Sequence, residues 1–315
     1  QNNQQKLQNY LEQASAIISN KFSFRISLEN FYNKFQLIKL ALSIYLLSLI
    51  IAFWHKRSFI YTALIANIIL ISSLIIRILI TNRPPISSLY ESLIFVATIF
   101  ALIPINYKNI REVINQRTKI ITISFLLAIS YIFKDHENNF ALISAILNTD
   151  FWLTIHVITI MLGYSMTIIT SLYGHYQLMK FPKNQHLTKS KIKIIYKLLA
   201  LSLLLTISGT ILGGFWADYS WGRFWGWDPK ENGALLIVFA LLIILHATFA
   251  GYLKNQNLLT ALISLNIIVI FSWLGVNLLN TGLHAYGFTN LGLMLFIIFI
   301  TAEISFIGYY RYLRK

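Results

Sequence analysis

The sequence predicts an all-α polytopic membrane protein, a bundle of eight or nine transmembrane helices. Of its 315 residues, 57% are hydrophobic and only 12% are charged, and the mean hydropathy is +0.64. A soluble domain has about twice that share of charged residues. Apolar runs of roughly 20 residues, the length that crosses a hydrocarbon core of about 30 Å, recur along the chain. They lack the roughly ten-residue alternation of an outer-membrane barrel.

Nine apolar segments qualify as membrane spans. They lie at residues 37–54, 59–80, 88–106, 119–133, 151–179, 198–215, 233–253, 258–277 and 289–310. The segment at 119–133 is the shortest, so eight or nine spans are expected. Residues 1–36 form a polar N-terminal segment without a signal-peptide pattern, and residues 37–315 form one transmembrane domain. Because the sequence begins at Gln1 and not at a methionine, we expect it to be a piece of a longer chain.

The net charge of +15 is concentrated on alternate connections between these segments and on the C-terminal tail. The cations there are Lys56, Arg57, Lys108, Arg111, Arg117, Lys119, Lys180, Lys183, Lys189, Lys191, Lys193, Lys197, Lys254, Arg311, Arg314 and Lys315. The positive-inside rule makes that face cytoplasmic, and the opposite face is acidic overall. The charge therefore indicates membrane topology and argues against nucleic-acid binding. Basic residues before residue 40 fall on the other face, so either this region is translocated or a preceding span is missing.

Cysteine is absent from the sequence. The chain can therefore form no disulfide, ligate no metal through a thiolate and use no thiol nucleophile. Any sulfur chemistry in which it takes part must come from a partner.

A cluster of tryptophans predicts a binding site between the sixth and seventh segments. Four of the seven tryptophans lie within residues 216–227, whereas an interfacial aromatic belt would spread over all spans. They are Trp216, Trp221, Trp225 and Trp227. The glycines at 213, 214, 222 and 226 would let a flat ligand approach the backbone, although glycines also serve turns. Asp228, Pro229 and Glu231 predict a capping box that starts the next helix sharply and fixes the orientation of Trp225 and Trp227.

Three histidines lie where they can reach a ligand at this loop or within the bundle. Counting spans places the loop, His156 and His284 at the same membrane surface. Two imidazoles beside an aromatic platform suit haem, whose iron takes axial histidines, although each could also be a hydrogen-bonded structural residue. His246 lies about 17 residues beyond the predicted helix start at Pro229, roughly 25 Å down, and is either an internal haem ligand or a packed, hydrogen-bonded neutral histidine.

The remaining ionisable residues of interest receive no functional role from the sequence. Four histidines lie in or near polar segments and are expected to be solvated: His55, His136, His175 and His186. Arg77 and Glu303 are charged positions within predicted spans, and the sequence identifies no partner for either.

The segment "WADYSWGRFWGWDPKENGALL" resembles the tryptophan-rich (WWD) signature of haem-handling proteins in cytochrome c maturation, specifically the CcsA (ResC-type) family of System II synthases. Three further motifs match in order: "NRPPISSLYESLIFV" at 82–96, "FWLTIHVITIMLGYS" at 151–165 and "GVNLLNTGLHAYGF" at 275–288. The resemblance implies an extracytoplasmic haem-binding loop, with His156 and His284 as external axial ligands and His246 as the family's transmembrane histidine. Thr248 departs from the basic residue that often occupies its place.

The resemblance also implies an activity and a site. The activity is transport of haem b to the outer face and its attachment, through thioether bonds, to the C-x-x-C-H motif of apocytochrome c, which makes the chain part of a holocytochrome c synthase (haem lyase). The residues that it places against haem are Trp216, Trp221, Gly222, Phe224, Trp225, Trp227 and Asp228, together with the three histidines. The alternative is a haem exporter or chaperone of the CcmC type, which presents haem without attaching it.

The partner and the membrane follow from the same resemblance. The family works with a CcsB (ResB-type) membrane subunit, separate or fused ahead of this part, and residues 1–36 would be the tail of such a fusion. The membrane would be the bacterial cytoplasmic membrane, with the haem site facing the periplasm or the cell exterior, or alternatively the plastid thylakoid membrane. An electron-transfer cytochrome b is disfavoured because it needs paired deep histidines, and only His246 lies deep.

Overall fold

The computed structural model describes residues 22–84, 86, 88–103, 113–134, 150–180, 186–279 and 290–313. Within these ranges the regular structure is helical, without strands, which confirms the all-α prediction. Each of the nine predicted segments coincides with a helix, and seven helices of the described chain are long and apolar enough to cross a membrane. The chain divides into two compact units, residues 1–85 and 86–315. The boundary predicted at residue 36 stays a prediction.

Unit 1 is built on a pair of helices, α2 (Leu37–Ile51) and α3 (Lys56–Thr81), joined by a short turn. Residues 22–35 are also helical, so the described part of the predicted polar segment runs into the first spanning helix. Between α2 and α3, the Tyr45 hydroxyl donates to Asn67 Oδ1 at 2.6 Å in a buried site. Such polar contacts specify helix pairing where lipid removes the hydrophobic drive.

Arg77, for which no partner was predicted, is buried in the same unit. Its Nη1 donates to the Tyr32 hydroxyl at 3.4 Å, and its guanidinium lies 5.6 Å from the centre of the same ring. The charge therefore faces the interior of unit 1 and is not exposed to lipid.

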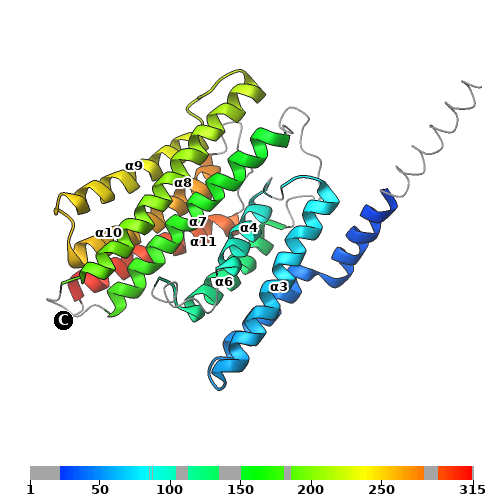
Figure 1. Ribbon diagram of the computed structural model, residues 1–315, viewed down its shortest axis with the longest axis horizontal. Coiled ribbons are helices and arrows are strands. Elements are labelled where there is room, and N and C mark those ends of the chain that lie inside the picture. The colour runs from blue at the N-terminus through cyan, green and yellow to red at the C-terminus, as the bar shows by residue number, and fades with distance from the viewer. Residues whose placement is uncertain are drawn as a thin grey trace, which may run out of the picture. The chain divides into compact units, whose positions relative to one another are not determined.

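Unit 2 holds the helices that carry the predicted site (Figure 1). They are α4 (Leu89–Leu102), α6 (Gln116–Lys134), α7 (Asp150–Lys180), α8 (Lys189–Trp221), α9 (Pro229–Phe249), α10 (Asn255–Trp273) and α11 (Asn290–Gly308). A 3-10 turn, η1 (Gly275–Leu279), follows α10, and a π-helical turn, η2 (Tyr309–Leu313), follows α11. The helix α7 packs along α8 on one side and against α10 on another, α9 packs against α8 and α10, and α4 pairs with α6.

Small residues bring α7 and α8 unusually close. A Cβ atom added to Gly209 would lie 2.7 Å from Ile160 Cα, and one added to Gly163 would lie 2.8 Å from Thr206 Oγ1. Glycine at these positions lets the two backbones touch, which is the usual basis of tight helix pairing in membranes.

The basic connections of unit 2 meet at one end of the bundle. Asn255, at the start of α10, accepts from the Leu187 amide at 3.0 Å, just before α8 begins. Gln256 donates to the Tyr310 carbonyl at the end of α11. The Lys180, Lys189, Lys254 and Arg311 region is therefore one end of unit 2, as the span count predicted, and the tryptophan loop is at the other end.

Candidate haem-binding site

His156 is held in one orientation by α8. Its Nδ1 lies 2.8 Å from the Gly209 carbonyl oxygen, and its ring stacks on Trp216 at 5.9 Å with 9° between the planes. Because a carbonyl oxygen only accepts, Nδ1 carries a proton, and in the neutral imidazole Nε2 then carries the lone pair. This is the tautomer in which a histidine ligates a metal through Nε2, and a backbone carbonyl is a usual orienting partner for such a ligand.

The first two tryptophans of the cluster lie on a helix, not in the loop. The helix α8 continues to Trp221, six residues beyond the predicted end of its span, and closes at Gly222, whose φ of 68° is the left-handed conformation that favours glycine at a helix C-terminus. Trp216 is buried, and its ring lies 4.8 Å from that of Trp221 at 66°. Helical geometry therefore sets both rings relative to His156.

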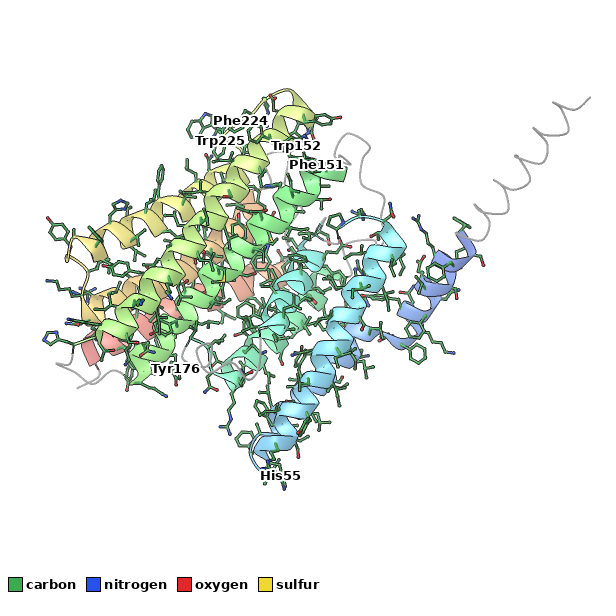
Figure 2. All side chains as sticks on the ribbon, in the orientation of Figure 1. His55, Phe151, Trp152, Tyr176, Phe224 and Trp225 are labelled. Carbon is green, nitrogen blue, oxygen red and sulfur yellow. The ribbon has the colours of Figure 1, made fainter. Side chains whose placement is uncertain are left out.

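The loop folds back on the ends of α7 and α8. The Phe224 ring packs over Gly214, where a Cβ atom would lie 2.4 Å from Phe224 Cζ, and it meets Phe215 edge-on at 5.5 Å. Phe215 in turn lies 5.5 Å from Trp152, at the start of α7. Figure 2 shows Trp152, Phe224 and Trp225 gathered at this end of unit 2.

The predicted capping box is confirmed. Asp228, buried as the N-cap of α9, accepts from the Lys230 amide at 2.9 Å, and Pro229 begins the helix. The Glu231 carboxylate accepts from the Asp228 amide at 3.1 Å and also from the Gly226 amide at 2.8 Å. One side chain therefore ties down both the helix start and the loop before it.

Trp227 adopts a left-handed backbone conformation, with φ of 56°. This conformation costs a residue with a side chain about 1–2 kcal/mol, so something must hold it. Asn232 donates from Nδ2 to the Trp227 carbonyl at 2.9 Å, one turn into α9. The Trp227 ring is 71% exposed, and it meets Trp225 edge-on at 6.1 Å. The loop thus presents a tryptophan outward at the cost of backbone strain.

A second anchor joins the start of α9 to α10 and α4. Lys230 donates from Nζ to the Trp273 carbonyl at the end of α10, where a cation suits the helix dipole. Trp273 is buried, and its indole Nε1 donates to Ser92 Oγ on α4 at 3.2 Å. Trp273 therefore couples the loop to two further helices.

The glycines near the loop have packing and turn-forming roles. A Cβ atom at Gly213 would lie 2.7 Å from His156 Cε1, and one at Gly226 would overlap the Arg223 side chain. Gly214 faces Phe224 and Gly222 caps α8, as described above. These glycines make room for protein side chains and for a turn, and their contact with a flat ligand stays a prediction.

His246 lies in the last turn of α9, at the end far from the tryptophan loop. Its ring is exposed on the surface of unit 2, and its Nδ1 bonds to the Leu242 carbonyl oxygen at 2.8 Å. In the neutral imidazole, Nε2 would carry the lone pair here too. The alternative prediction was a packed, hydrogen-bonded histidine. The hydrogen bond is present, but the exposed side chain is not packed.

The other histidines divide into three cases. His284 and His136 lie outside the described residues, so the convergence of His156 and His284 on one iron stays a prediction. His55 and His186 are exposed, as expected. His175 was expected to be solvated and is not: its Nε2 lies 2.9 Å from Glu303 Oε2 inside unit 2, because α11 packs against the middle of the bundle.

Several site residues were not predicted from the sequence. Trp152 lies one turn before His156 on the same helix face, a spacing that could have revealed it. Asn232 acts through the Trp227 carbonyl five residues earlier, a contact outside the capping-box pattern. Trp273 acts through its carbonyl with Lys230, 43 positions away, for which no local pattern exists. Taken together, the site offers an oriented imidazole nitrogen beside stacked and edge-on aromatic rings, which suits a flat apolar macrocycle with a central metal.

Comparison with known proteins identifies a family for this chain. The family model described as cytochrome C assembly protein matches residues 86–284. The chain is similar to the cytochrome c biogenesis protein CcsA of Chlamydomonas reinhardtii, with 29% identity over 240 residues, covering 72% of this chain and 67% of that protein. It is 27% identical over 283 residues to CcsA of Parasynechococcus marenigrum, covering 77% of this chain and 92% of that protein.

A third relative is much longer. Protein NrfI of Wolinella succinogenes is 29% identical over 226 residues, which cover 68% of this chain and 24% of NrfI. The matched family region contains α4 through η1, and thus His156, the tryptophan loop and His246. On this match the chain belongs to the cytochrome c assembly protein family, and it is a multi-pass membrane protein of CcsA-type cytochrome c biogenesis.

Proposed function

We propose that this chain is the haem-binding membrane subunit of a System II cytochrome c synthase. It holds haem b at the tryptophan-loop end of unit 2 and catalyses its attachment to the C-x-x-C-H motif of apocytochrome c. The observation that carries this proposal is the geometry of His156, whose Nδ1 is fixed on the Gly209 carbonyl and whose ring is stacked on Trp216. An imidazole held in this way is suited to bind haem iron as an axial ligand. The four clustered aromatic residues beside it, and the membership of the chain in a family of cytochrome c assembly proteins, support the same role.

The reaction needs little from the protein beyond binding and orientation. Each cysteine S–H of the apocytochrome adds across a haem vinyl group: sulfur bonds to one vinyl carbon, the proton goes to the other, and no electrons are transferred. His156 and His284 would hold the iron axially. Trp221, Phe224, Trp225 and Trp227 would form the wall that orients the vinyl edge, and a thiol held next to it reacts as an intramolecular partner.

His246 would serve an earlier step. Its exposed ring at the far end of α9 lies where a helix of a CcsB (ResB-type) subunit would cover it, so the two subunits together would receive haem before it moves to the loop. In this arrangement the tryptophan-loop end faces the periplasm or the cell exterior of a bacterial cytoplasmic membrane, or the lumen of a plastid thylakoid. Apocytochrome c and haem are the substrates.

The test is co-expression with a CcsB-type subunit and a c-type apocytochrome, followed by haem staining of the denatured cytochrome. His156→Gly and His284→Gly should each abolish attachment, and added imidazole should restore part of it by filling the vacated ligand position. His186→Gly, the same change at an exposed histidine, is the matched control and should attach normally. Full attachment by the His156 variant without imidazole would contradict the assignment.

The same preparations separate the synthase from the alternative haem exporter or chaperone of the CcmC type. A chaperone would purify with haem, and lose it in the His156 variant, yet would support no attachment in the parent strain. His246→Ala should lower the haem that purifies with the complex; unchanged haem content would make His246 a residue of the partner interface only.

A further inference from the structure

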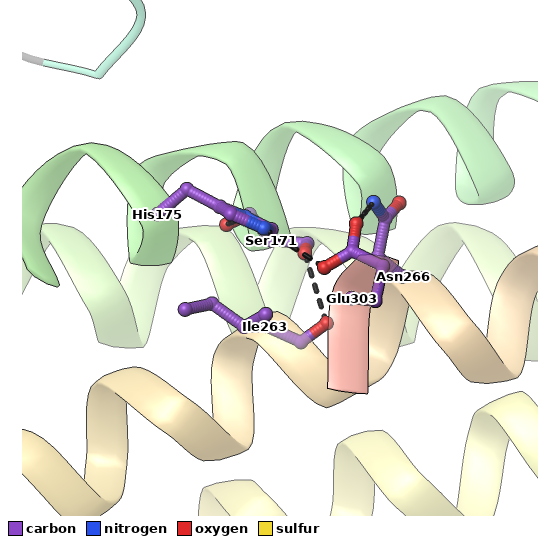
Figure 3. Close-up of polar contacts among 5 residues, drawn as sticks. All are labelled: Ser171, His175, Ile263, Asn266 and Glu303. Carbon is purple, nitrogen blue, oxygen red and sulfur yellow. Dashed lines mark hydrogen bonds and ion pairs between the residues drawn. The ribbon is translucent and has the colours of Figure 1, made fainter. Parts of the chain in front are cut away.

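A buried polar cluster joins α11 to the middle of unit 2 (Figure 3). Glu303 on α11 accepts from Asn266 Nδ2 of α10 at 2.6 Å through Oε1, and its Oε2 lies 2.9 Å from His175 Nε2 on α7. Ser171, one turn before His175, donates to the Ile263 carbonyl of α10 at 3.1 Å and closes the cluster. Three helices therefore meet at one carboxylate.

The hydrogen bonds fix the proton count of this cluster. His175 Nδ1 lies 2.9 Å from the Ser171 carbonyl oxygen, which only accepts, so Nδ1 carries a proton. The 2.9 Å contact between Nε2 and Oε2 then requires one more proton between them, on either atom. In both forms the pair has no net charge, which is the condition under which an ionisable residue is tolerated inside a membrane.

Glu303 matters because α11 has so little else buried. Only Gly292 and Glu303 are buried in this helix, all of which is described, and half of its large apolar side chains are exposed while the other half are only partly covered. Between helices in lipid, apolar surface gives no preference for protein over lipid, so hydrogen bonds and close packing decide where a helix docks. The carboxylate of Glu303 is therefore the buried polar attachment of α11 to the bundle, and the Gln256 bond to the Tyr310 carbonyl lies beyond the end of the helix.

We infer that Glu303 is a positioning residue, which with His175 and Asn266 fixes α11 and thereby the anchor of the chain that carries His284. His284 precedes the first residue of α11, Asn290, by six positions, and on its other side the chain is tied to η1, which ends at Leu279. Releasing α11 would free one of these two anchors. This inference rests on the proposed role of His284 as a haem ligand.

We call the contacts of Glu303 with His175 and Asn266 the clamp. The clamp is tested by cross-linking, which requires neither haem nor apocytochrome. The chain has no cysteine, so Phe271→Cys and Phe296→Cys, whose rings lie 6.5 Å apart between α10 and α11, would be its only thiols. A short bis-maleimide should join them in membranes. Adding Glu303→Leu should lower the cross-linked fraction roughly fivefold to tenfold, whereas Glu303→Gln, which can still accept from Asn266 and donate to His175, should stay near the parent value.

Controls keep the test decisive. Ser202→Ala removes a buried polar contact between α7 and α8, the 3.1 Å bond to Thr170, and should leave the cross-link unchanged. If Glu303→Leu does not accumulate, Asn266→Leu, which removes one of the two bonds to the carboxylate, takes its place and should also lower cross-linking. If the leucine variant that accumulates cross-links as much as the parent chain does, the clamp does not exist.

The link to His284 is tested by attachment in the cysteine-free chain. Glu303→Leu should lower haem attachment, added imidazole should restore part of it, and Glu303→Gln should attach normally. A variant that is merely unstable would gain nothing from imidazole. Loss of the cross-link with unchanged attachment, or a loss that imidazole does not repair, would refute the positioning role and leave the clamp. Absence of attachment by the parent would refute the proposed function and leave the cross-linking result valid.

Discussion

The position of the His156 ring depends on the absence of a side chain at residue 213. Gly213 has no Cβ, and the space that a Cβ would take is filled by His156 Cε1, 2.7 Å from the ideal Cβ position. Real Cβ atoms do not approach other atoms so closely, so any larger residue at 213 must push the ring away from α8. The bond from Nδ1 to the Gly209 carbonyl would lengthen or break at the same time.

We therefore expect Gly213→Ala to lower haem attachment by roughly 10- to 100-fold, because small misplacements of a catalytic ligand have effects of that size. Added imidazole should recover part of the activity, as for a ligand that is present but displaced. Haem staining of the co-expressed cytochrome measures both. Gly308→Ala, at a helical glycine whose added Cβ would meet nothing within 4 Å, is the control and should be silent.

At the scale of elements, the start of α9 organises the loop. Asp228, Glu231 and Asn232 together satisfy the first amides of α9, the Gly226 amide and the strained Trp227 carbonyl. The helix start and the presentation of Trp227 are therefore one structural unit. A change that frays the first turn of α9 must also release the loop.

Asp228→Ala should destabilise the first turn of α9 by about 1 kcal/mol, the usual cost of losing an N-cap side chain. Hydrogen exchange of the amides at 230–233 should quicken, and haem attachment should fall. Asp228→Ser, which keeps a capping oxygen, should be close to the parent. Thr188→Ala removes the N-cap of α8 at the opposite end of the bundle and should quicken exchange there without affecting attachment. If Asp228→Ala attached haem as well as the parent chain does, the N-cap of α9 would have no role in the site.

Sequence patterns predicted the helices better than their ends and contacts. Run length located the nine named α-helices of the described ranges, and the capping box was legible because its three residues are local. The end of α8 was misplaced at residue 215 because polar residues such as Asp218 end an apolar run without ending a helix. The pairing of His175 with Glu303 spans 128 positions, and no local pattern reports which helices become neighbours.

For the whole molecule, the span count makes a prediction about sidedness. Exposed Tyr219 lies near the tryptophan loop, and exposed His186 lies at the basic end. In the cysteine-free chain, Tyr219→Cys should react with a membrane-impermeant maleimide added outside intact cells, and His186→Cys should react only after the cells are opened, because basic connections stay in the cytoplasm. Labelling of both from the same side would disprove the predicted topology.

The length of α8 decides at what depth the site operates. Its 33 residues extend roughly 50 Å at 1.5 Å per residue, about 20 Å more than the hydrocarbon core of a bilayer. The charged first turns of α8, at Lys189–Lys197, extend beyond the hydrocarbon core and account for part of this excess length. The last turn, around Trp216–Trp221, extends beyond the core at the other end and accounts for the rest. The tryptophans then lie at the depth of the lipid headgroups. On the proposed function, an apolar porphyrin arriving along the membrane and an unfolded peptide arriving from water would meet there without either leaving its own solvent.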